Sequence, residues 1–317
     1  MHKSRSSSRN NTRSIRRRGT WLTLGLFTLS GALTVIGWST DVAAQWPEVA
    51  DRAAPRDAEG NVIMDAPPPR MPDGTPNLSG LWTRTRSGPP PEEGPGGGVS
   101  LEPPAAAVPL DPDGPPIAAF FEAGENMEGG LPYTPWAKEI RDQRFALKAR
   151  DNPDAQCMPM GFLQFHQQPQ PRMIIQTEKM ILIEYEANYG VRHIYMDGRA
   201  LPPQGEPQPW WYGYSVGHWE DDDLVVETNN LRGAEDSPYD AWLDVNGSPY
   251  SREAKITERF RRPTFGHLQI DFTIEDPKAY TRPWTVRIDQ RLVPDQELIE
   301  FICNENQQFG RRIQLDN

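Results

Sequence analysis

The sequence is poor in the residues that most often hold metal ions. Its 317 residues include only two cysteines and five histidines, and no H-x-H or H-E-x-x-H spacing occurs. A zinc site of the usual kind would therefore lack ligands. From this scarcity we expect no metal and no cofactor.

The N-terminus has the pattern of a secretory leader. Seven Lys and Arg residues without an acid precede an apolar stretch at 21–38, which ends in TDVAAQW. Val42 and Ala44 supply the small residues that signal peptidase requires, so residues 1–44 are predicted to be a cleaved signal peptide. The Sec route is the simplest interpretation, with Tat export and a retained membrane anchor as alternatives. We expect a periplasmic or secreted protein without a stable membrane anchor after cleavage.

Basic charge is scarce once the leader is removed. The whole chain carries a net charge of −11, and residues 1–44 hold seven basic side chains and one acid, so the remaining 273 residues carry −17. Such a surface repels phosphate backbones and anionic lipid head groups. Nucleic-acid and membrane-surface partners are therefore not expected, whereas a small-molecule ligand is. The sequence does not indicate an oligomeric state.

Both cysteines, Cys157 and Cys303, lie in the exported part. In an oxidising compartment two cysteines most simply form one disulfide. Two unpaired buried thiols are the alternative.

Proline divides the exported chain into two parts. Residues 47–135 hold 19 of the 33 prolines, which remove amide donors and disfavour regular helices and sheets. We expect 45–135 to be an extended wrap with one short strand near 78–84, and a mobile loop near 87–115 that is either a lid or disordered. Residues 136–317 are predicted to be a β-rich domain with one leading helix.

The leading helix has clear start and stop signals. Thr134 can cap it, Pro135 suits its first position, and Asn152-Pro153 ends it. Its predicted apolar face consists of Trp136, Ile140, Phe145 and Leu147.

From residue 162 onward the hydrophobic period is two, which is typical of strands. Two strands flank Glu178-Lys179, and a third precedes Asp197-Gly198. Further strands are expected at about 210–219, 223–229, 252–262, 266–274, 283–292 and 297–303. The fold is therefore predicted to be mainly β, an antiparallel meander forming a lipocalin-like barrel or a sandwich.

The stretch GYSVG at 213–217 fits the G-x-S-x-G pattern of a serine hydrolase. That motif requires a helix after the serine, whereas a strand, an acidic turn and another strand are predicted here. Asp244 or Asp271 with His267 would complete a triad-like order, but we interpret Ser215 as a strand residue. Gly213 and Gly217 would then give room to a close neighbour.

The acidic run 220–223 suggests calcium. Calcium requires six or more staggered oxygens, which four consecutive carboxylates do not supply. We interpret the run as a hairpin turn in which Asp tolerates a positive φ.

Several blocks taken together resemble a large family of exported, mostly uncharacterised bacterial proteins. They are DGTPNLSGLW, IYMDGR, YSVGHWEDDDLVVET, TERFRRP and EDPKAYTRPWTV, which span about residues 72–305. The resemblance implies a periplasmic location and a β-rich fold, without a known reaction. Asp221 stands where those relatives have Gly, which favours the turn interpretation. Tyr214 and Asn304 replace histidines of the family pattern, so any chemistry of those histidines would be altered here.

Two functions remain open. The first is a small-molecule-binding barrel for a sugar, phenolic or terpenoid-like ligand, because Trp, Tyr, Arg and carboxylates suit such ligands. The second is a hydrolase, lyase or isomerase that uses a carboxylate with His or Tyr. Its candidate catalytic residues are His218 and Glu220. The candidate ligand-binding residues are His193, Asp197, Arg199, Tyr212, Tyr214, and Tyr280, Arg282 and Trp284, the last three expected on one strand face.

Overall fold

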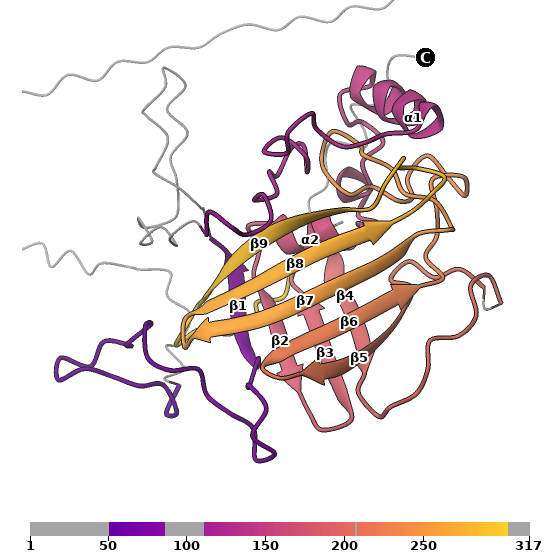
Figure 1. Cartoon of the computed structure of the whole chain (residues 1–317). Coiled ribbons are helices and arrows are strands. Elements are labelled where there is room, and N and C mark those ends of the chain that lie inside the picture. The colour runs from indigo at the N-terminus through magenta and orange to yellow at the C-terminus, as the bar shows by residue number, and fades with distance from the viewer. Residues whose placement is uncertain (1–50, 86–110, 207, 304–317) are drawn as a thin grey trace, which may run out of the picture. The chain divides into compact units, whose positions relative to one another are not determined.

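The computed structural model describes residues 51–85, 111–206 and 208–303 of the chain. Nine strands close into a barrel in sequence order (Figure 1). The strands are β1 (Gly80–Arg84), β2 (Arg172–Gln176), β3 (Met180–Tyr185), β4 (Gly190–Tyr195), β5 (Tyr214–Glu220), β6 (Asp223–Asn229), β7 (Lys255–Thr264), β8 (His267–Glu275) and β9 (Trp284–Leu292). The prediction of a mainly β fold that forms a barrel is confirmed.

The barrel is not a pure meander. Strands β4 and β5 pair in parallel, with Ile194 opposite Ser215 and Tyr195 opposite Val216. The prediction of an antiparallel meander was wrong for this one pair of strands. A parallel pair requires a crossover connection rather than a tight turn, and residues 196–213 supply it.

The predicted helix is α1 (Pro135–Ala146), and the Thr134 side chain accepts a hydrogen bond from the amide of Ala137. Its apolar face was predicted wrongly in part, because Phe145 and Leu147 are 52% and 42% exposed. Arg144 is buried instead and stacks on the ring of Trp242 at 4.5 Å. A long side chain with an apolar stem can take such a place.

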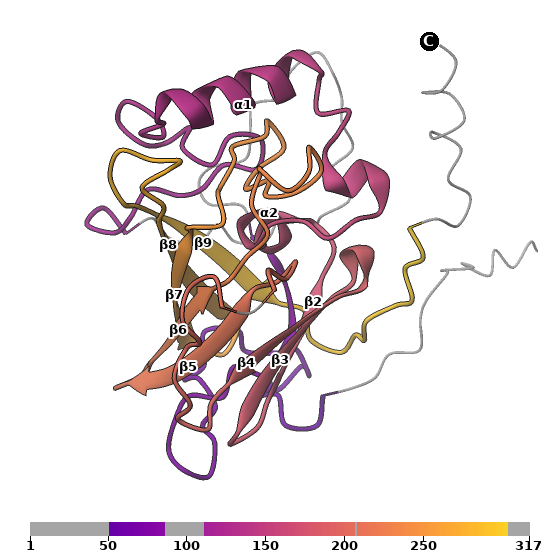
Figure 2. The same ribbon diagram turned by 90° about the vertical axis from the view of Figure 1, so that its right-hand side faces the viewer.

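A second helix was not predicted. Residues Phe162–Gln167 form α2, within the region that the sequence assigned to strands. All six residues are buried, and α2 lies between α1 and the strands (Figure 2). Single helical turns also occur at η1 (Pro153–Gln156) and η2 (Ala187–Tyr189).

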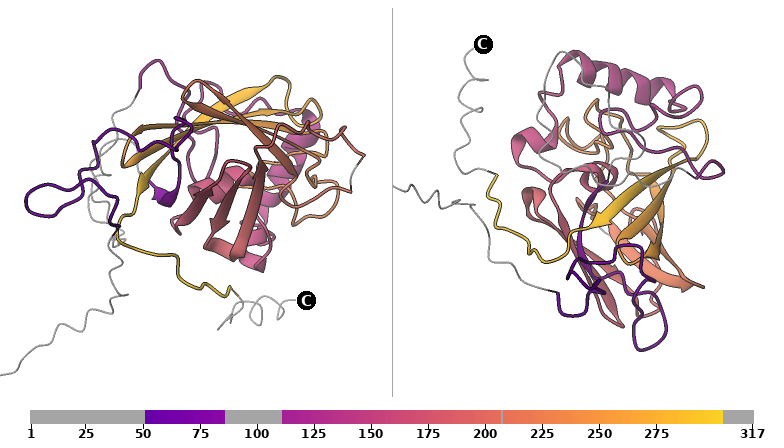
Figure 3. Two further views of the ribbon diagram at one scale, coloured as in Figure 1. Left: turned by 90° about the horizontal axis from the view of Figure 1, so that it is seen from below. Right: turned by 90° about the vertical axis from the view of Figure 1, so that its left-hand side faces the viewer.

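The Pro-rich region lies against one end of the barrel over residues 51–79, as Figure 3 shows. Phe265 and Gly266, in the β7–β8 turn, donate backbone hydrogen bonds to Ala66 and Met64. The predicted loop near 87–115 falls mostly on residues outside the described ranges. The strand predicted at 297–303 is absent, because these residues pair with no neighbouring strand.

Strand alternation places the core inside the barrel. Ile181, Ile183 and Tyr185 of β3 face inward, each 1% exposed, as their spacing predicts. The largest buried side chains include Trp82, Phe260 and Phe272. Side chains therefore fill the barrel interior rather than line an open channel.

Candidate functional site

Four side chains stack in a row on the outer face of β4 and β5. The Arg199 guanidinium lies 3.9 Å from the ring centre of Tyr195. The Tyr195 and Tyr214 ring centres are 5.2 Å apart, and Trp210 follows at 5.5 Å from Tyr214. Trp210 ends the row and is 41% exposed. The barrel thus presents an aromatic surface to solvent, which we call the aromatic row.

An ion pair fixes one end of the aromatic row. Arg199 Nη2 lies 2.6 Å from Asp197 Oδ2, and Arg199 Nη1 donates to the Tyr214 hydroxyl at 3.0 Å. The hydrogen bond from Arg199 holds the pKa of Asp197 at about 2. The carboxylate is therefore ionised at neutral pH and offers oxygen atoms to hydroxyl groups of a ligand.

Three predicted ligand-binding residues, Asp197, Arg199 and Tyr214, thus come together. His193 is exposed on the same face of β4, two residues before Tyr195. Sequence reasoning missed Tyr195 and Trp210 as members. The alternation of GVRHIY, residues 190–195, puts Tyr195 on the same strand face as His193. No sequence pattern could show that Trp210 stacks on Tyr214.

The other predicted ligand-binding residues lie elsewhere. Tyr212 packs against Phe162 of α2, with ring centres 6.3 Å apart. The expectation of Tyr280, Arg282 and Trp284 on one strand face was wrong, because β9 begins at Trp284. Arg282 lies in a bend before it, and Tyr280 forms an isolated bridge with Tyr133. Tyr280 and Trp284 are each 2% exposed, whereas Arg282 is exposed.

The predicted catalytic pair lies on the outside of the barrel. His218 Nε2 and Glu220 Oε1 are 3.2 Å apart, and both side chains are 51% exposed. Glu220 Oε2 also accepts a hydrogen bond from Arg259 Nη2 at 2.6 Å. This bond lowers the pKa of Glu220, so its carboxylate is held in the charged form. A catalytic role for the two stays a prediction.

The acidic run forms a hairpin turn, as predicted. Asp221 has φ 53°, and Asp222 pairs with Arg70 of the Pro-rich region at 2.7 Å. Asp223 Oδ2 bonds to two arginines of β7. No group of three or more potential metal ligands occurs within the described ranges.

Ser215 is a buried strand residue and not a nucleophile elbow. It is 1% exposed, and its hydroxyl lies 2.8 Å from that of Thr228 on β6. Strand β6 comes next after β5, and no helix follows Ser215 within the described residues. A Cβ on Gly213 would lie 2.6 Å from the carbonyl oxygen of Asn229, and one on Gly217 would lie 2.6 Å from the Met196 sulfur. The two glycines therefore make room for close neighbours, as expected.

The residues proposed for a triad with Ser215 have other partners. His267 pairs with Asp289, with Nε2 and Oδ1 2.8 Å apart, and Asp271 pairs with Arg287. Asp244 accepts hydrogen bonds from Ser248 instead.

A charged cluster lies inside the barrel. His166 Nε2 of α2 is 2.8 Å from Glu258 Oε1 of β7, and Arg192 Nη2 of β4 is 2.5 Å from Glu258 Oε2. Arg192 also donates to the hydroxyls of Ser215 and Thr228 at 3.2 and 2.9 Å. The three charged or titratable side chains are at most 1% exposed. We call these five residues the interior cluster.

Burial and pairing set the charges of the interior cluster. Burial alone would raise the pKa of Glu258, but the Arg192 guanidinium and the bond to His166 outweigh it and hold this pKa at about 2. Burial lowers the pKa of His166. The cluster therefore holds an ionised carboxylate, a guanidinium and a neutral imidazole.

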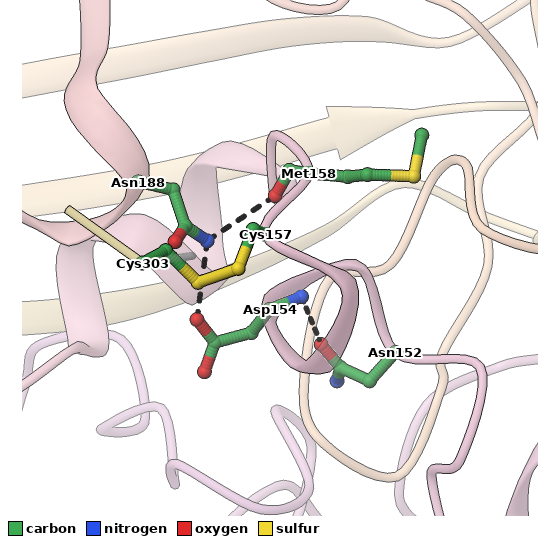
Figure 4. The surroundings of a disulfide bond; sticks show 6 residues. All are labelled: Asn152, Asp154, Cys157, Met158, Asn188 and Cys303. Carbon is green, nitrogen blue, oxygen red and sulfur yellow. Dashed lines mark hydrogen bonds between the residues drawn. A yellow bond between two sulfur atoms is a disulfide. The ribbon is translucent and has the colours of Figure 1, made fainter. Parts of the chain in front are cut away.

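The predicted disulfide is present. Cys157 and Cys303 are joined across a sequence separation of 146 residues (Figure 4). Beside it, the Asn188 side-chain amide donates to Asp154 Oδ1 at 3.2 Å and to the Met158 carbonyl at 3.3 Å. The bond ties the segment before α2 to the C-terminal segment.

Comparisons with family models, with curated proteins and with solved structures found no match to this chain. Within the described residues, no helix is both long and apolar enough to cross a membrane.

Proposed function

We propose that this protein is a periplasmic β-barrel that binds a small, neutral, ring-containing molecule on its aromatic row. A sugar is the ligand class that we propose first. The observation that carries the proposal is the stacking of Tyr195, Tyr214 and Trp210 beside the Asp197–Arg199 ion pair. Aromatic rings provide apolar contact, and fixed polar groups orient a ligand.

The charges in the aromatic row favour a neutral ligand. Arg199 is already paired with Asp197, so its charge is offset within the row. The exported part of the chain is also strongly acidic. An anionic ligand would meet repulsion from this surface, whereas hydroxyl groups would find both donors and acceptors.

The location rests on the sequence and the disulfide. The leader at 1–44 predicts export, and the Cys157–Cys303 bond is compatible with an oxidising compartment. The resemblance to exported bacterial proteins supports the same proposal.

Calorimetric titration of residues 45–317 with neutral oligosaccharides and simple phenolics tests the proposal. We expect Trp210→Ala to weaken binding about tenfold, because an aromatic stack contributes roughly 0.5–1.5 kcal/mol beyond its buried area. Phe121→Ala is the matched control, since Phe121 is 60% exposed and belongs to another segment. Equal binding by the Trp210 variant and the wild type would contradict the proposal. A ligand recovered chemically changed would favour the hydrolase, lyase or isomerase alternative.

A further inference from the structure

We propose that the ligand of the aromatic row is a glycoside with an uncharged apolar chain, and that this chain lies on the outer face of β2, β3 and β4. The inference rests on the proposed function and extends it, because it names the part of the ligand that the aromatic row does not hold.

The outer face of β2, β3 and β4, which lie side by side in Figure 2, is largely apolar. Alternate residues such as Ile174, Ile183 and Ile194 face inward and are at most 2% exposed. The residues between them face outward and are half-buried or exposed: Met173, Ile175, Met180, Leu182, Glu184, Val191, His193 and Tyr195. Glu184 is the only Asp, Glu, Lys or Arg among these outward residues, although 24% of the whole chain is charged. Apolar side chains gathered on one exposed face mark a binding surface.

This apolar face is continuous with the aromatic row. In the strand register Ile175 lies opposite Leu182, and Leu182 lies opposite His193, so these three outward side chains are neighbours across three strands. Tyr195 follows His193 on the same face of β4, and Met180 lies opposite Tyr195. A ligand with its hydroxyl groups at the ion pair that ends the aromatic row can therefore extend over apolar side chains toward β2.

A pocket of about 450 Å³ lies at the far edge of the apolar face. Met173 of β2 lines it together with Leu81, its partner on β1, and with Leu292 at the end of β9. Three strand spacings separate β4 from β1, so the apolar path from Tyr195 to this pocket is roughly 14 Å long. Its length and its apolar lining suit an alkyl chain or a slender apolar ring system.

Charges around the pocket indicate that the chain ends in an uncharged group. Asp51 and Glu297 line the pocket, and so does Asp295, which has its own arginine partner. Arg262 also lines it, but its guanidinium already donates to the carbonyl oxygen of Phe265. A carboxylate at the end of the chain would be repelled by these acids. This charge pattern favours a glycoside over a free fatty acid.

Calorimetric titration of residues 45–317 with methyl and octyl β-glycosides of glucose, galactose and maltose tests the inference, each below its critical micelle concentration. For at least one sugar we expect the octyl form to bind ten times or more as tightly as the methyl form. Each fully buried methylene group strengthens binding by up to about fourfold. Octyl tetraethylene glycol has the same chain without a sugar, and we expect it to bind at least about tenfold more weakly than the octyl glycoside.

The double variant Ile175→Thr, Leu182→Thr locates the chain. Threonine retains the β-branched shape that suits a strand and removes apolar contact. We expect this variant to lose most of the gain of the octyl over the methyl form, with the affinity for the methyl form unchanged within about twofold. Ile63→Thr is the matched control, because Ile63 is 42% exposed and Ile175 is 43% exposed. Melting temperatures show whether the variants are folded.

The outcomes separate this inference from the proposed function. Methyl glycosides that bind through Trp210 without any gain from the octyl chain would overturn the inference and leave the proposed function intact. Binding of neither form of any sugar contradicts both. An octyl gain that the double variant keeps, or equal binding of octyl tetraethylene glycol, also overturns the inference.

Sedimentation of the wild type, alone and with phosphatidylcholine vesicles, tests two other occupants of the same face. We expect neither self-association nor vesicle binding that depends on Ile175 and Leu182. A dimer or a vesicle-bound form that the double variant abolishes would overturn the inference, because a second copy or a membrane would then cover this face.

Discussion

Removal of Arg192 is expected to destabilise the barrel strongly, because it leaves Glu258 charged and unpaired in the core. The perturbation is Arg192→Met, which keeps much of the volume and the contact of the side chain with the Phe162 ring. Breaking a buried ion pair by removing one partner costs about 3–5 kcal/mol.

The pKa of Glu258 gives a second route to the magnitude. The ordinary pKa of 4.5 falls to about 2 in the folded protein, which corresponds to roughly 3 kcal/mol. Because this pKa is lowered by folding, the contribution is present above about pH 4.5 and is lost as the pH falls toward 2. We therefore expect Arg192→Met to cost about 3–5 kcal/mol at pH 7 and progressively less in acid.

Urea unfolding at pH 7 and at pH 3 measures these differences. The double variant Arg192→Met, Glu258→Leu should recover most of the loss, because an apolar pair replaces the ion pair without an isolated charge. Arg259→Met is the control, since its partner Glu220 is exposed and such pairs contribute about 0–1 kcal/mol. A loss below about 1 kcal/mol in Arg192→Met, or a double variant as unstable as the single one, would refute the reasoning.

Two further predictions concern stability. Replacing Cys157 and Cys303 by serine should lower the free energy of unfolding by up to about 5 kcal/mol, because the loop that the disulfide closes spans 146 residues. Equal melting temperatures for the variant and the oxidised wild type would count against this expectation. Gly161→Ala should cost about 1–3 kcal/mol, since the new Cβ would lie 2.3 Å from the backbone oxygen of Trp242. Chemical denaturation measures this loss in the free energy of unfolding. A change within about 0.5 kcal/mol would contradict the close packing of Gly161, at the start of α2, against Trp242.

Local pattern predicted the strands well because burial on one face imposes a period of two. This period put Ile181 and Ile183 inward and showed that Ser215 lies in a strand. The hydrophobic period failed where contacts between residues distant in the sequence decide the structure. Helix α2 is too short to show a helical repeat, and nothing in residues 196–213 indicates that β5 runs parallel to β4.

The aromatic row and the interior cluster differ in how far the sequence could predict them. Asp197, Arg199 and Tyr214 lie close together in the chain. A local sequence pattern could therefore predict that they belong to one site. The interior cluster joins residues that are 66 and 92 positions apart in the chain. Strand alternation does place Arg192 and Glu258 on apolar inner faces, and two inward-facing charges of opposite sign were the available signal.

Ligand mapping on the aromatic row tests the central claim most directly. Residues 45–317, labelled with ¹⁵N, are titrated with the best-binding neutral sugar of the calorimetric panel, and shifts of amide and indole resonances are recorded. The account predicts that the largest shifts occur at the Trp210 indole and at the amides of Tyr195 and Tyr214. Shifts confined to other parts of the barrel, or no shifts with any sugar, would contradict it.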